Sequence, residues 1–431
     1  MYEPRDVLIL EGVRTPFCRA GTQLATIPAR ELGRAAVREA IERADLAPTE
    51  IDEVIVGNIA SPHDAANVAR VISLSAGVPR GVPAYTVNRN CGSALQAIAD
   101  GALKIQAGLA GVVVAAGVES MSQIPVLYPE SFKKILARAA RAKSSRGRIA
   151  ALAGLRPRDF RPVIALEAGL TDPISGLNMG ETAEVLAREF GITRDEQDAF
   201  ALESHMRASR AWQAGRFADE VVPLPLPPRY DTLAERDNGY RENQSLEALE
   251  KLRPYFDKRY GTVTAGNSSQ ITDGAAAVVL ASAERAQGIG ARPLGRIRSW
   301  AFAACDPARM GLGPVFAIPQ ALERAGLALH EIGLIEINEA FAAQVLACGR
   351  AMASREFARE ALNLSSPVGT LDPERTNVNG GAIALGHPVG ASGARLVLTL
   401  LKEMARRNAA LGLATMCIGG GQGGAMVVER V

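Results

Sequence analysis

The chain has 431 residues, of which 48% are hydrophobic and 22% are charged, and it contains 42 glycines. This length and balance predict a compact α/β protein that buries a large core and divides into two or three domains. The formal net charge of +2 gives no general argument for nucleic-acid binding, and we expect none.

The cysteines and the apolar runs indicate the cellular setting. The five cysteines are scattered and include no C-x-x-C pair, which favours reduced thiols in a cytosol-like compartment over a disulfide framework or a zinc site. The opening "MYEPRDVLIL" carries charges where a secretion signal needs an apolar core. The longest apolar run, 107–118, is too short for a membrane span. We therefore expect a cytoplasmic protein that holds no metal.

Three units near the start of the chain recur in the same order near its end. Each pair shares its predicted elements: a helix end, loop and strand; a V-N strand end before a small-residue turn and a helix; and a buried strand. Their order and spacing favour an internal duplication over a chance likeness between α/β units. The pairs are 44–59 with 325–340, 84–105 with 375–401, and 111–120 with 411–421.

The middle of the chain loses this rhythm. Residues 178–217 are strongly helical, with a break at "GITRDEQ" in which Thr193 and Glu196 predict a capping box. The proline-rich "VVPLPLPPRY" is expected to be extended. These patterns predict a mainly helical domain inserted into the first half. The expected boundaries are 1–121 with 265–285 for the first half, 122–264 for the insertion and 286–431 for the second half.

Cys91 is the first candidate for chemistry. It lies in "NRNCGSALQAIADGALKI", at the expected start of a helix that follows a strand. The unpaired N–H groups and positive dipole of a helix start lower the pKa of a thiol, and the small neighbours leave room for a substrate. A buried structural cysteine is the alternative, and it is the commoner fate of a lone cysteine.

Two residues of the second half are candidate partners. His387 stands in the glycine-rich "NGGAIALGHPVGASGAR", in the unit that corresponds to the one holding Cys91. An imidazole within hydrogen-bond reach of a thiol generates thiolate at neutral pH, although a loop histidine packed on Pro388 is the alternative. Asn338 ends the strand in "LIEINEAFAAQ". It either caps the next helix or holds a water or a substrate oxygen.

A second thiol, Cys417, opens the glycine-rich stretch "CIGGGQGG". Gly419, Gly421 and Gly424 match G-x-G-x-x-G, but a dinucleotide fingerprint must open a helix. The segment that follows, "AMVVERV", reads as a strand, so we expect a tight hairpin with Cys417 at its entrance. Five glycines so close together indicate that another group approaches this backbone closely.

Together, these motifs resemble those of the thiolases, in order and over nearly the whole chain. The resemblance implies a duplicated five-layer α-β-α-β-α fold with an inserted loop domain and a homodimer or homotetramer. It also implies coenzyme A thioesters as substrates, with coenzyme A a substrate and no separate cofactor. The matching blocks are "NRNCGSALQA", "GVESMS", "NMGETAE", "GITRDEQDAFALESH", "TAGNSSQITDGAAAV", "EINEAFAAQ", "NVNGGAIALGHPVGASGAR" and "CIGGGQGG".

The resemblance also implies roles for single residues. Cys91 matches the nucleophile that takes the acyl group, and His387 matches the base that activates it. Cys417 matches the acid/base that serves the substrate α-carbon or the incoming thiol. Asn338, through a water and with His387, would form one oxyanion hole, and the backbone N–H groups of Cys91 and Gly419 would form the other. The match to Ser269 implies contact with the pantetheine arm of coenzyme A.

Two departures bear on the subtype. Asn178 in "NMGETAE" stands where biosynthetic acetoacetyl-CoA thiolases have a histidine, and the insertion is longer than in short-chain thiolases. Both favour a degradative 3-ketoacyl-CoA thiolase, similar to the β-subunits of fatty-acid oxidation complexes, over the biosynthetic alternative. A fatty-acid-type condensing enzyme would have one cysteine with two histidines, which Asn338 and Cys417 argue against. An inactive lipid-binding or scaffold subunit would not need the four candidate side chains.

Residues 131–162 are strongly basic in a chain that is otherwise near neutral. The stretch contains ten Lys and Arg residues and one acidic residue, Asp159. The apolar residues between them predict amphipathic helices with basic faces. A solvated face or a patch that meets the phosphates of coenzyme A is one interpretation. Docking to an anionic membrane or to a partner subunit of a β-oxidation complex is the other.

Overall fold

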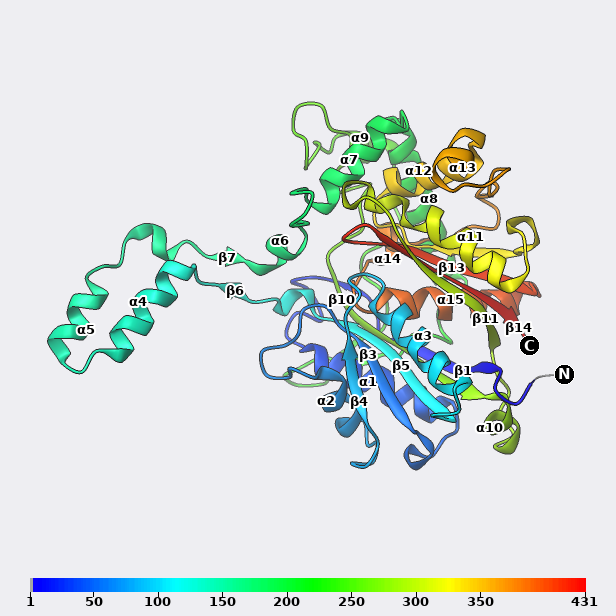
Figure 1. Ribbon diagram of the computed structural model, residues 1–431, viewed down its shortest axis with the longest axis horizontal. Coiled ribbons are helices and arrows are strands. Elements are labelled where there is room, and N and C mark those ends of the chain that lie inside the picture. The colour runs from blue at the N-terminus through cyan, green and yellow to red at the C-terminus, as the bar shows by residue number, and fades with distance from the viewer. Residues whose placement is uncertain (1–2) are drawn as a thin grey trace.

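A ten-stranded sheet runs through the molecule in the order β12-β13-β14-β11-β1-β10-β5-β3-β4, and β2 pairs with β10 (Figure 1). The computed structural model describes residues 3–431. The strands are β1 (Val7–Arg14), β2 (Cys18–Arg19), β3 (Glu53–Gly57), β4 (Ala84–Val87), β5 (Val112–Glu119), β10 (Thr272–Ser282), β11 (Gly295–Ala304), β12 (Leu334–Ile337), β13 (Leu411–Ile418) and β14 (Gln422–Arg430).

The sheet consists of two similar halves joined by a short link. β1 and β11 pair only at Leu8 with Arg296 and at Ile9 with Gly295. In the first half β3 is parallel to both β4 and β5, and in the second half β12 is parallel to β13. An isolated parallel bridge from Ile335 to Thr376 occupies the place that β4 has in the first half. The repeated topology confirms the duplication predicted from the sequence.

Three apolar clusters lie between five layers, and the central cluster fills the space on both sides of the middle layer of helices. In β5, Val112, Val114 and Ala116 face one cluster with the outer helices α1 and α2, while Val113 and Ala115 face the central cluster. The central cluster packs α3 and α15 between the two half-sheets, and a third cluster covers the second half-sheet with α11 and α12. The five-layer prediction is confirmed. These helices are α1 (Ala29–Arg43), α2 (Val68–Ser75), α3 (Ser93–Gln106), α11 (Gly313–Ala325), α12 (Ala342–Ala353) and α15 (Ser392–Arg407).

The segment predicted to be an insertion lies between β5 and β10, and its longest elements are helices. The capping box predicted at Thr193 is present, since its hydroxyl accepts the Glu196 N–H at 3.2 Å and the Glu196 carboxylate accepts the Thr193 N–H at 2.8 Å. Its elements are α4 (Glu130–Arg141), α5 (Ser145–Leu152), α6 (Ala165–Gly169), α7 (Met179–Glu189), α8 (Arg194–Gln213) and α9 (Leu246–Glu250), with two short ladders formed by β6 (Val126–Leu127) with β7 (Val163–Ile164) and β8 (Leu224–Pro225) with β9 (Leu233–Ala234). Beyond the insertion, the remaining helices are α10 (Ala283–Gly288), α13 (Arg355–Ala361) and α14 (Ala382–Leu385).

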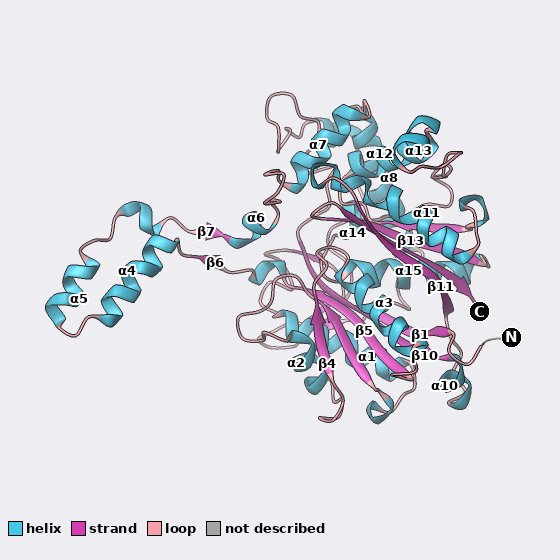
Figure 2. Cartoon of the chain, in the orientation of Figure 1, coloured by secondary structure: helices cyan, strands magenta, loops and turns pink. Residues whose placement is uncertain are grey.

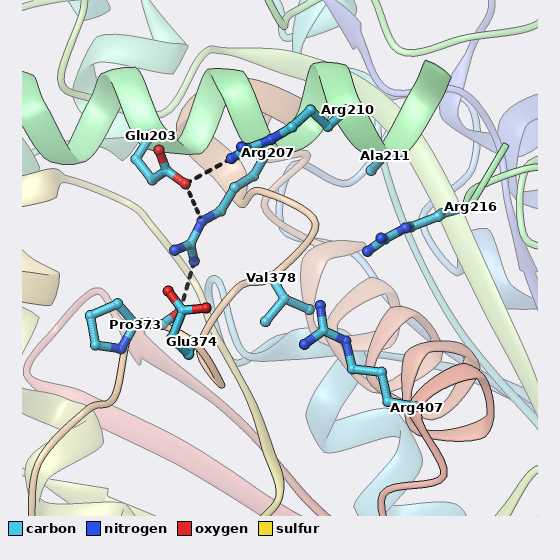
Figure 3. A pocket seen from close by; sticks show the side chains of 9 residues that line it. All are labelled: Glu203, Arg207, Arg210, Ala211, Arg216, Pro373, Glu374, Val378 and Arg407. Atoms are coloured by element: carbon cyan, nitrogen blue, oxygen red, sulfur yellow. Dashed lines mark hydrogen bonds and ion pairs between the residues drawn. The ribbon is translucent and has the colours of Figure 1, made fainter. Parts of the chain in front are cut away.

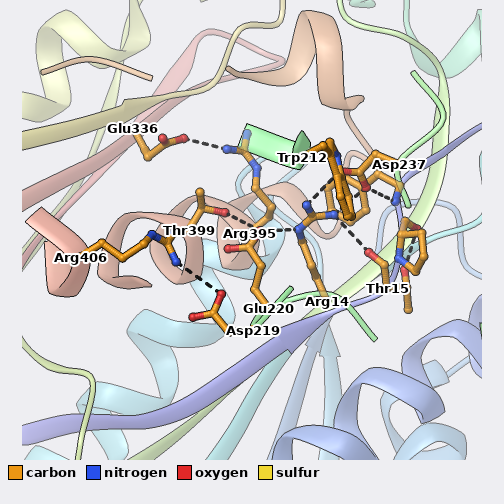
Figure 4. A network of polar contacts seen from close by, with 12 residues as sticks. Arg14, Thr15, Trp212, Asp219, Glu220, Asp237, Glu336, Arg395, Thr399 and Arg406 are labelled. Carbon is orange, nitrogen blue, oxygen red and sulfur yellow. Dashed lines mark hydrogen bonds and ion pairs between the residues drawn. The ribbon is translucent and has the colours of Figure 1, made fainter. Parts of the chain in front are cut away.

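A buried ionic network attaches the insertion to both halves (Figure 4). Arg14, at the end of β1, donates to Glu220 at 2.7 Å and to both carboxylate oxygens of Asp237 at 2.6 and 2.9 Å. Glu220 also accepts from Thr399 of α15 at 3.2 Å. Because a buried charge is stable only when it is paired, this network holds residues 220–237 in one position against the body.

The basic stretch forms a hairpin that projects away from the body (Figures 1 and 2). It consists of α4, α5 and the short 3-10 helix Pro157–Phe160, on a stalk formed by β6 and β7. At its base Tyr128 stacks on Phe132, with ring centroids 4.4 Å apart, and Phe160 packs edge-on against Phe132 at 5.4 Å. Between residues 3 and 431 there is no helix that combines the length and the apolar character required to cross a membrane.

Candidate active site

Cys91 lies in the loop between β4 and α3, where the first half meets the second. The helix begins at Ser93 with Gly92 as its N-cap, so Cys91 precedes the helix instead of lying in its first turn. Its thiol lies against the backbone N–H of Gly419, in the glycine loop of the second half. Asn90 fixes that contact, because its side-chain amide donates to the Gly419 carbonyl at 2.8 Å.

The expected fall in the pKa of Cys91 is not observed. Burial raises the pKa of this thiol, the N–H groups of Gly419 and Cys91 lower it, and the nearby carboxylate of Glu119 raises it further. Loss of solvation outweighs two backbone dipoles, because a thiolate in an apolar setting loses most of its hydration. Cys91 therefore needs a proton acceptor to become a nucleophile at neutral pH.

Cys417 is the last residue but one of β13, and the predicted hairpin is present. β13 pairs with β14 in antiparallel register, with Cys417 opposite Gly423. Gly420 and Gly421 turn the chain with φ of 86° and 76°, which L side chains rarely adopt. Burial raises the pKa of the Cys417 thiol well above its usual value, and the neighbouring Cys91 adds to the shift. Cys417 is accordingly a protonated thiol beside Cys91.

His387 is buried and has a defined hydrogen-bond arrangement. Its Nδ1 lies 2.5 Å from the hydroxyl of Ser392, and that hydroxyl donates to the carbonyl of Pro388 at 3.1 Å. Since a hydroxyl has one proton, Ser392 accepts from Nδ1–H, which leaves Nε2 without a proton and able to accept one. Burial lowers the pKa of His387 to about 3, and the guanidinium of Arg395 adds to this. The imidazole is therefore neutral, with its basic nitrogen directed away from Ser392.

Asn338 does not cap a helix. The following helix, α12, begins at Ala342 with Phe341 as its N-cap. Instead, the Asn338 amide Nδ2 lies 3.4 Å from His387 Nε2, and its Oδ1 is buried without a protein partner. This pairing excludes the capping interpretation and places an amide next to the imidazole.

Neighbouring parallel strands bring the two pairs of residues together. Asn338 follows β12 directly, and its N–H donates to the Thr415 carbonyl of β13 at 2.9 Å. Cys417 lies two residues further along β13, and the carboxyl ends of adjacent parallel strands form one edge. Cys91 reaches this edge from the other half, as its contact with the Gly419 N–H shows. The site thus forms where the two halves meet.

The two positions singled out for coenzyme A have different surroundings. Ser269 is half-buried, and its N–H donates to the Ala340 carbonyl at 2.9 Å. Ala340 follows Asn338 by two residues in the chain, so Ser269 lies near the segment that carries Asn338. Asn178 is the N-cap of α7, and its side chain accepts the Gly180 N–H at 3.0 Å. The asparagine that replaces a histidine in this motif therefore has a structural use as a helix cap.

Several residues that shape the site carried no assigned role in the sequence analysis. Ser392 orients the imidazole, Asn90 holds the Gly419 carbonyl, and Thr272 accepts the His387 N–H at 3.2 Å. All three lie inside quoted motifs: Ser392 in "GHPVGASGAR", Asn90 in "NRNCG" and Thr272 in "TAGNSSQITDGAAAV". Their place within a motif could have identified them as neighbours, but only the fold shows which atoms they contact.

An arginine-rich pocket lies elsewhere, at the C-terminal ends of α8 and α15 (Figure 3). Arg207 and Arg210 both donate to Glu203, and Arg407 donates to Glu403. Arginines in the last turns of helices also stabilise the negative end of the helix dipole. These pairings account for the charge of the pocket. Within 3–431, no group of three or more His, Cys, Asp and Glu residues is arranged to hold a metal ion.

Comparisons with known proteins agree with the fold. The family model described as "Thiolase, N-terminal domain" matches residues 7–284, and "Thiolase, C-terminal domain" matches 291–430. The chain is 43% identical to the 3-ketoacyl-CoA thiolases of Erwinia tasmaniensis and of Photorhabdus laumondii, over 98% of this chain and 96% of each relative.

Solved structures show the same architecture. Human mitochondrial 3-ketoacyl-CoA thiolase superposes with a TM-score of 0.86 at 38% identity and covers 100% of both chains. The Bacillus anthracis acetyl-CoA acetyltransferase superposes with a TM-score of 0.87 at 38% identity over 99% of both chains. The human enzyme has also been solved in complex with CoA. With both family models matched in order and the duplicated five-layer fold present, this chain belongs to the thiolase family.

Proposed function

We propose that this protein cleaves 3-ketoacyl-CoA with coenzyme A, yielding acetyl-CoA and a shortened acyl-CoA through an acyl thioester on Cys91. The observation that carries this proposal is the meeting of Cys91 with the Gly419 N–H, beside a buried Asn338–His387 pair, in one site between the halves. The identity of 43% with 3-ketoacyl-CoA thiolases over nearly the full length supports this substrate class.

The first half-reaction breaks the bond between C2 and C3 of the substrate. His387 Nε2 accepts the Cys91 proton, and the thiolate attacks the C3 carbonyl. When the C2–C3 bond breaks, its electron pair goes to C2, which takes the proton of Cys417. Acetyl-CoA leaves, the acyl group stays on Cys91, and Cys417 remains as a thiolate.

The second half-reaction returns both cysteines to their starting state. The Cys417 thiolate takes the proton of the incoming coenzyme A thiol, which attacks the acyl-Cys91 carbonyl. The shortened acyl-CoA leaves, and Cys91 recovers its proton from His387. The raised pKa of Cys417 supports this role, because a thiol that is hard to ionise is a poor nucleophile but a strong base once deprotonated.

Two sets of donors would stabilise the oxyanions. The N–H groups of Gly419 and Cys91 converge on the Cys91 thiol, where the acyl-enzyme carbonyl would form. The Asn338 amide and the His387 imidazole, with a bridging water, would serve the other thioester carbonyl. Loss of one such donor typically costs about 2.7–4 kcal/mol in the transition state. Ser269 would contact the pantetheine arm, since its hydrogen bond to Ala340 holds it near Asn338 and therefore near the reacting thioester.

A trapping experiment tests the acyl-enzyme. Cys91→Ser should abolish turnover with the fold retained, whereas Cys417→Ala should take up the acyl group and fail to complete the cycle. Intact-mass measurement after exposure to an acyl-CoA reads both, because coenzyme A leaves as a thiolate and this transfer needs no proton from Cys417. An acyl adduct on a residue other than Cys91, or no adduct in Cys417→Ala, contradicts the assignment.

The direction of the reaction distinguishes the alternatives. A biosynthetic enzyme would condense two acetyl-CoA and prefer acetoacetyl-CoA, whereas the proposed enzyme accepts longer 3-ketoacyl chains. Initial rates with short, medium and long 3-ketoacyl-CoA, compared with the rate of acetyl-CoA condensation, decide between them. A scaffold subunit would release no coenzyme A from acetoacetyl-CoA, an outcome that the presence of Cys91, His387, Asn338 and Cys417 argues against.

The projecting hairpin supports a second property, docking to an anionic membrane surface. Its ten basic residues extend away from the body, and Ile149 and Leu152 of α5 are 68% and 41% exposed. Exposed apolar side chains among basic ones suit the interface of an anionic bilayer, where each Lys or Arg contributes roughly 1 kcal/mol. Binding to a partner subunit or to coenzyme A phosphates is the alternative.

Vesicle binding separates these interpretations. Co-sedimentation with anionic vesicles should occur at low salt and fall at high salt, and it should weaken when Lys134, Arg138 and Arg141 of α4 are changed to Gln. The matched control changes three exposed arginines of the body, Arg38, Arg210 and Arg359, to Gln, with the same loss of charge. Equal weakening in both variants, or no binding at low salt, contradicts membrane docking by the hairpin.

A further inference from the structure

A buried carboxylate that the mechanism does not use lies between the two halves, next to the loop that carries His387. Glu119 is the last residue of β5 in the first half, and its side chain is fully buried. One oxygen, Oε2, accepts the N–H groups of Ile59 and Gly390, each at 3.1 Å. The other, Oε1, accepts from the Asn58 side chain at 3.0 Å and from the Ala60 N–H at 3.1 Å.

The contact with Gly390 connects Glu119 to the catalytic loop. Gly390 belongs to the second half and lies three residues after His387 and two before Ser392. The other three donors lie just after β3 in the first half. A single carboxylate therefore joins the strand ends of one half to the histidine loop of the other.

The backbones approach each other closely at this point. A Cβ on Gly390 would lie 2.6 Å from the Val118 carbonyl and 2.7 Å from Glu119 Oε2. A Cβ on Gly117 would lie 2.1 Å from the Gly390 carbonyl. A side chain at either position would push the His387 loop away from β5. The distance between this loop and β5 therefore depends on both residues being glycine.

All four neighbours of the carboxylate are donors. These donors favour the ionised carboxylate and oppose the effect of burial, which raises the pKa of Glu119 to about 7. An anion that accepts four hydrogen bonds in a buried setting is a strong and directional anchor. We infer that Glu119 is a positioning residue for the thiolase reaction, which acts by holding the His387 loop against the first half.

This inference rests on the proposed role of His387 as the base that activates Cys91. Without the anchor at Gly390, the loop keeps the contact of His387 with Thr272 of β10 and its internal contact with Ser392, but it loses the hydrogen bond that ties Gly390 to the ends of β5 and β3. A misplacement of about 1 Å between reacting groups can cost about 100-fold in rate. The predicted consequence is slower formation of the Cys91 thiolate, with little effect on coenzyme A binding.

Two effects of removing this carboxylate have opposite signs, which makes the inference testable. The negative charge of Glu119 raises the pKa of Cys91, so a purely electrostatic role predicts faster alkylation of Cys91 by iodoacetamide when the charge is removed. A positioning role predicts slower alkylation, because His387 is no longer held in place. Glu119→Gln removes the charge and replaces one acceptor oxygen by a donor.

The experiment measures alkylation of Cys91 in four proteins: wild type, Glu119→Gln, His387→Ala and the double variant. We expect Glu119→Gln to slow alkylation by about 10- to 100-fold in the wild-type background and to lower kcat similarly, with KM for coenzyme A within about two-fold. In the His387→Ala background the same change should leave the rate equal or slightly faster. Glu53→Gln, which breaks a partly buried ion pair with Lys104 at 2.6 Å, is the control and should leave alkylation unchanged.

The outcomes separate the two proposals. If His387→Ala alkylates at the wild-type rate, the proposed base is wrong. If it slows alkylation but Glu119→Gln does not, or if Glu119→Gln slows alkylation equally in both backgrounds, the positioning role is wrong. Hydrogen–deuterium exchange of a peptide covering 386–395 reads the anchor independently, and unchanged exchange in Glu119→Gln also contradicts it. Glu119→Asp, which keeps the charge but shortens the reach, replaces Glu119→Gln if the latter does not fold.

Discussion

The glycine loop after Cys417 offers a matched pair of substitutions. Gly420 and Gly421 are adjacent and both have positive φ, at 86° and 76°, so alanine at either position adopts a left-handed conformation that costs roughly 1–2 kcal/mol. They differ in the space around them. A Cβ on Gly420 has its nearest neighbour at 3.9 Å, whereas a Cβ on Gly421 would lie 2.3 Å from the Cys305 carbonyl.

The expected magnitudes follow from that difference. Real Cβ contacts are not shorter than 3.0 Å, so Gly421→Ala forces a shift of about 0.7 Å between the loop and residues 305–307. The shift is transmitted through the hydrogen bond from the Cys305 N–H to the Gly421 carbonyl at 2.7 Å. Gly419, whose N–H meets Cys91, lies two residues away. We expect Gly421→Ala to lower kcat by roughly 100-fold and Gly420→Ala by only a few-fold.

Steady-state thiolysis and urea unfolding test this pair together. Gly420→Ala should lose roughly 1–2 kcal/mol of unfolding free energy, and Gly421→Ala should lose more, because it has the same backbone strain and a steric overlap. If both variants show the same kcat, the position of the Gly419 N–H does not depend on the contact with Cys305, and the reasoning is refuted.

Three other predictions follow from buried groups. His387→Ala should slow iodoacetamide alkylation of Cys91 at neutral pH, because the thiol loses its base. Cys417→Ala should leave this alkylation nearly unchanged but block condensation. Equal alkylation rates in wild type and His387→Ala would contradict the role of His387 as the base. Burial lowers the pKa of His205 to about 4. Between pH 6.5 and 4 this imidazole therefore stays neutral in the folded protein but takes up a proton in the unfolded chain. From pH 6.5 to 4 the free energy of unfolding should therefore fall by up to about 3 kcal/mol more in wild type than in His205→Gln. An equal fall in both proteins, measured by urea unfolding at each pH, would disprove this. Arg14→Met should cost about 3–5 kcal/mol of unfolding free energy, against almost nothing for the exposed Arg38→Met.

Features that depend on neighbours in the chain could be predicted from the sequence. The capping box at Thr193 and Glu196 joins residues three apart, and the hairpin at 417–424 follows from glycines between two apolar strands. The duplication could also be predicted, because strand and helix periods recur in the same order. In the site, Cys91, His387, Asn338 and Cys417 stood out because each belongs to a motif that secondary structure alone does not require.

Other properties arise only when distant segments pack together. The pKa of Cys91 rises where a helix start predicted a fall, because burial between two halves removes more solvation than nearby dipoles restore. Asn338 does not cap α12 but pairs with His387, 49 residues away, and only the fold shows this. Glu119 contacts Gly390 across 271 residues, and no local pattern marks that contact. Burial and long-range hydrogen bonds are set by which surfaces meet, and for these residues that is decided by the tertiary structure.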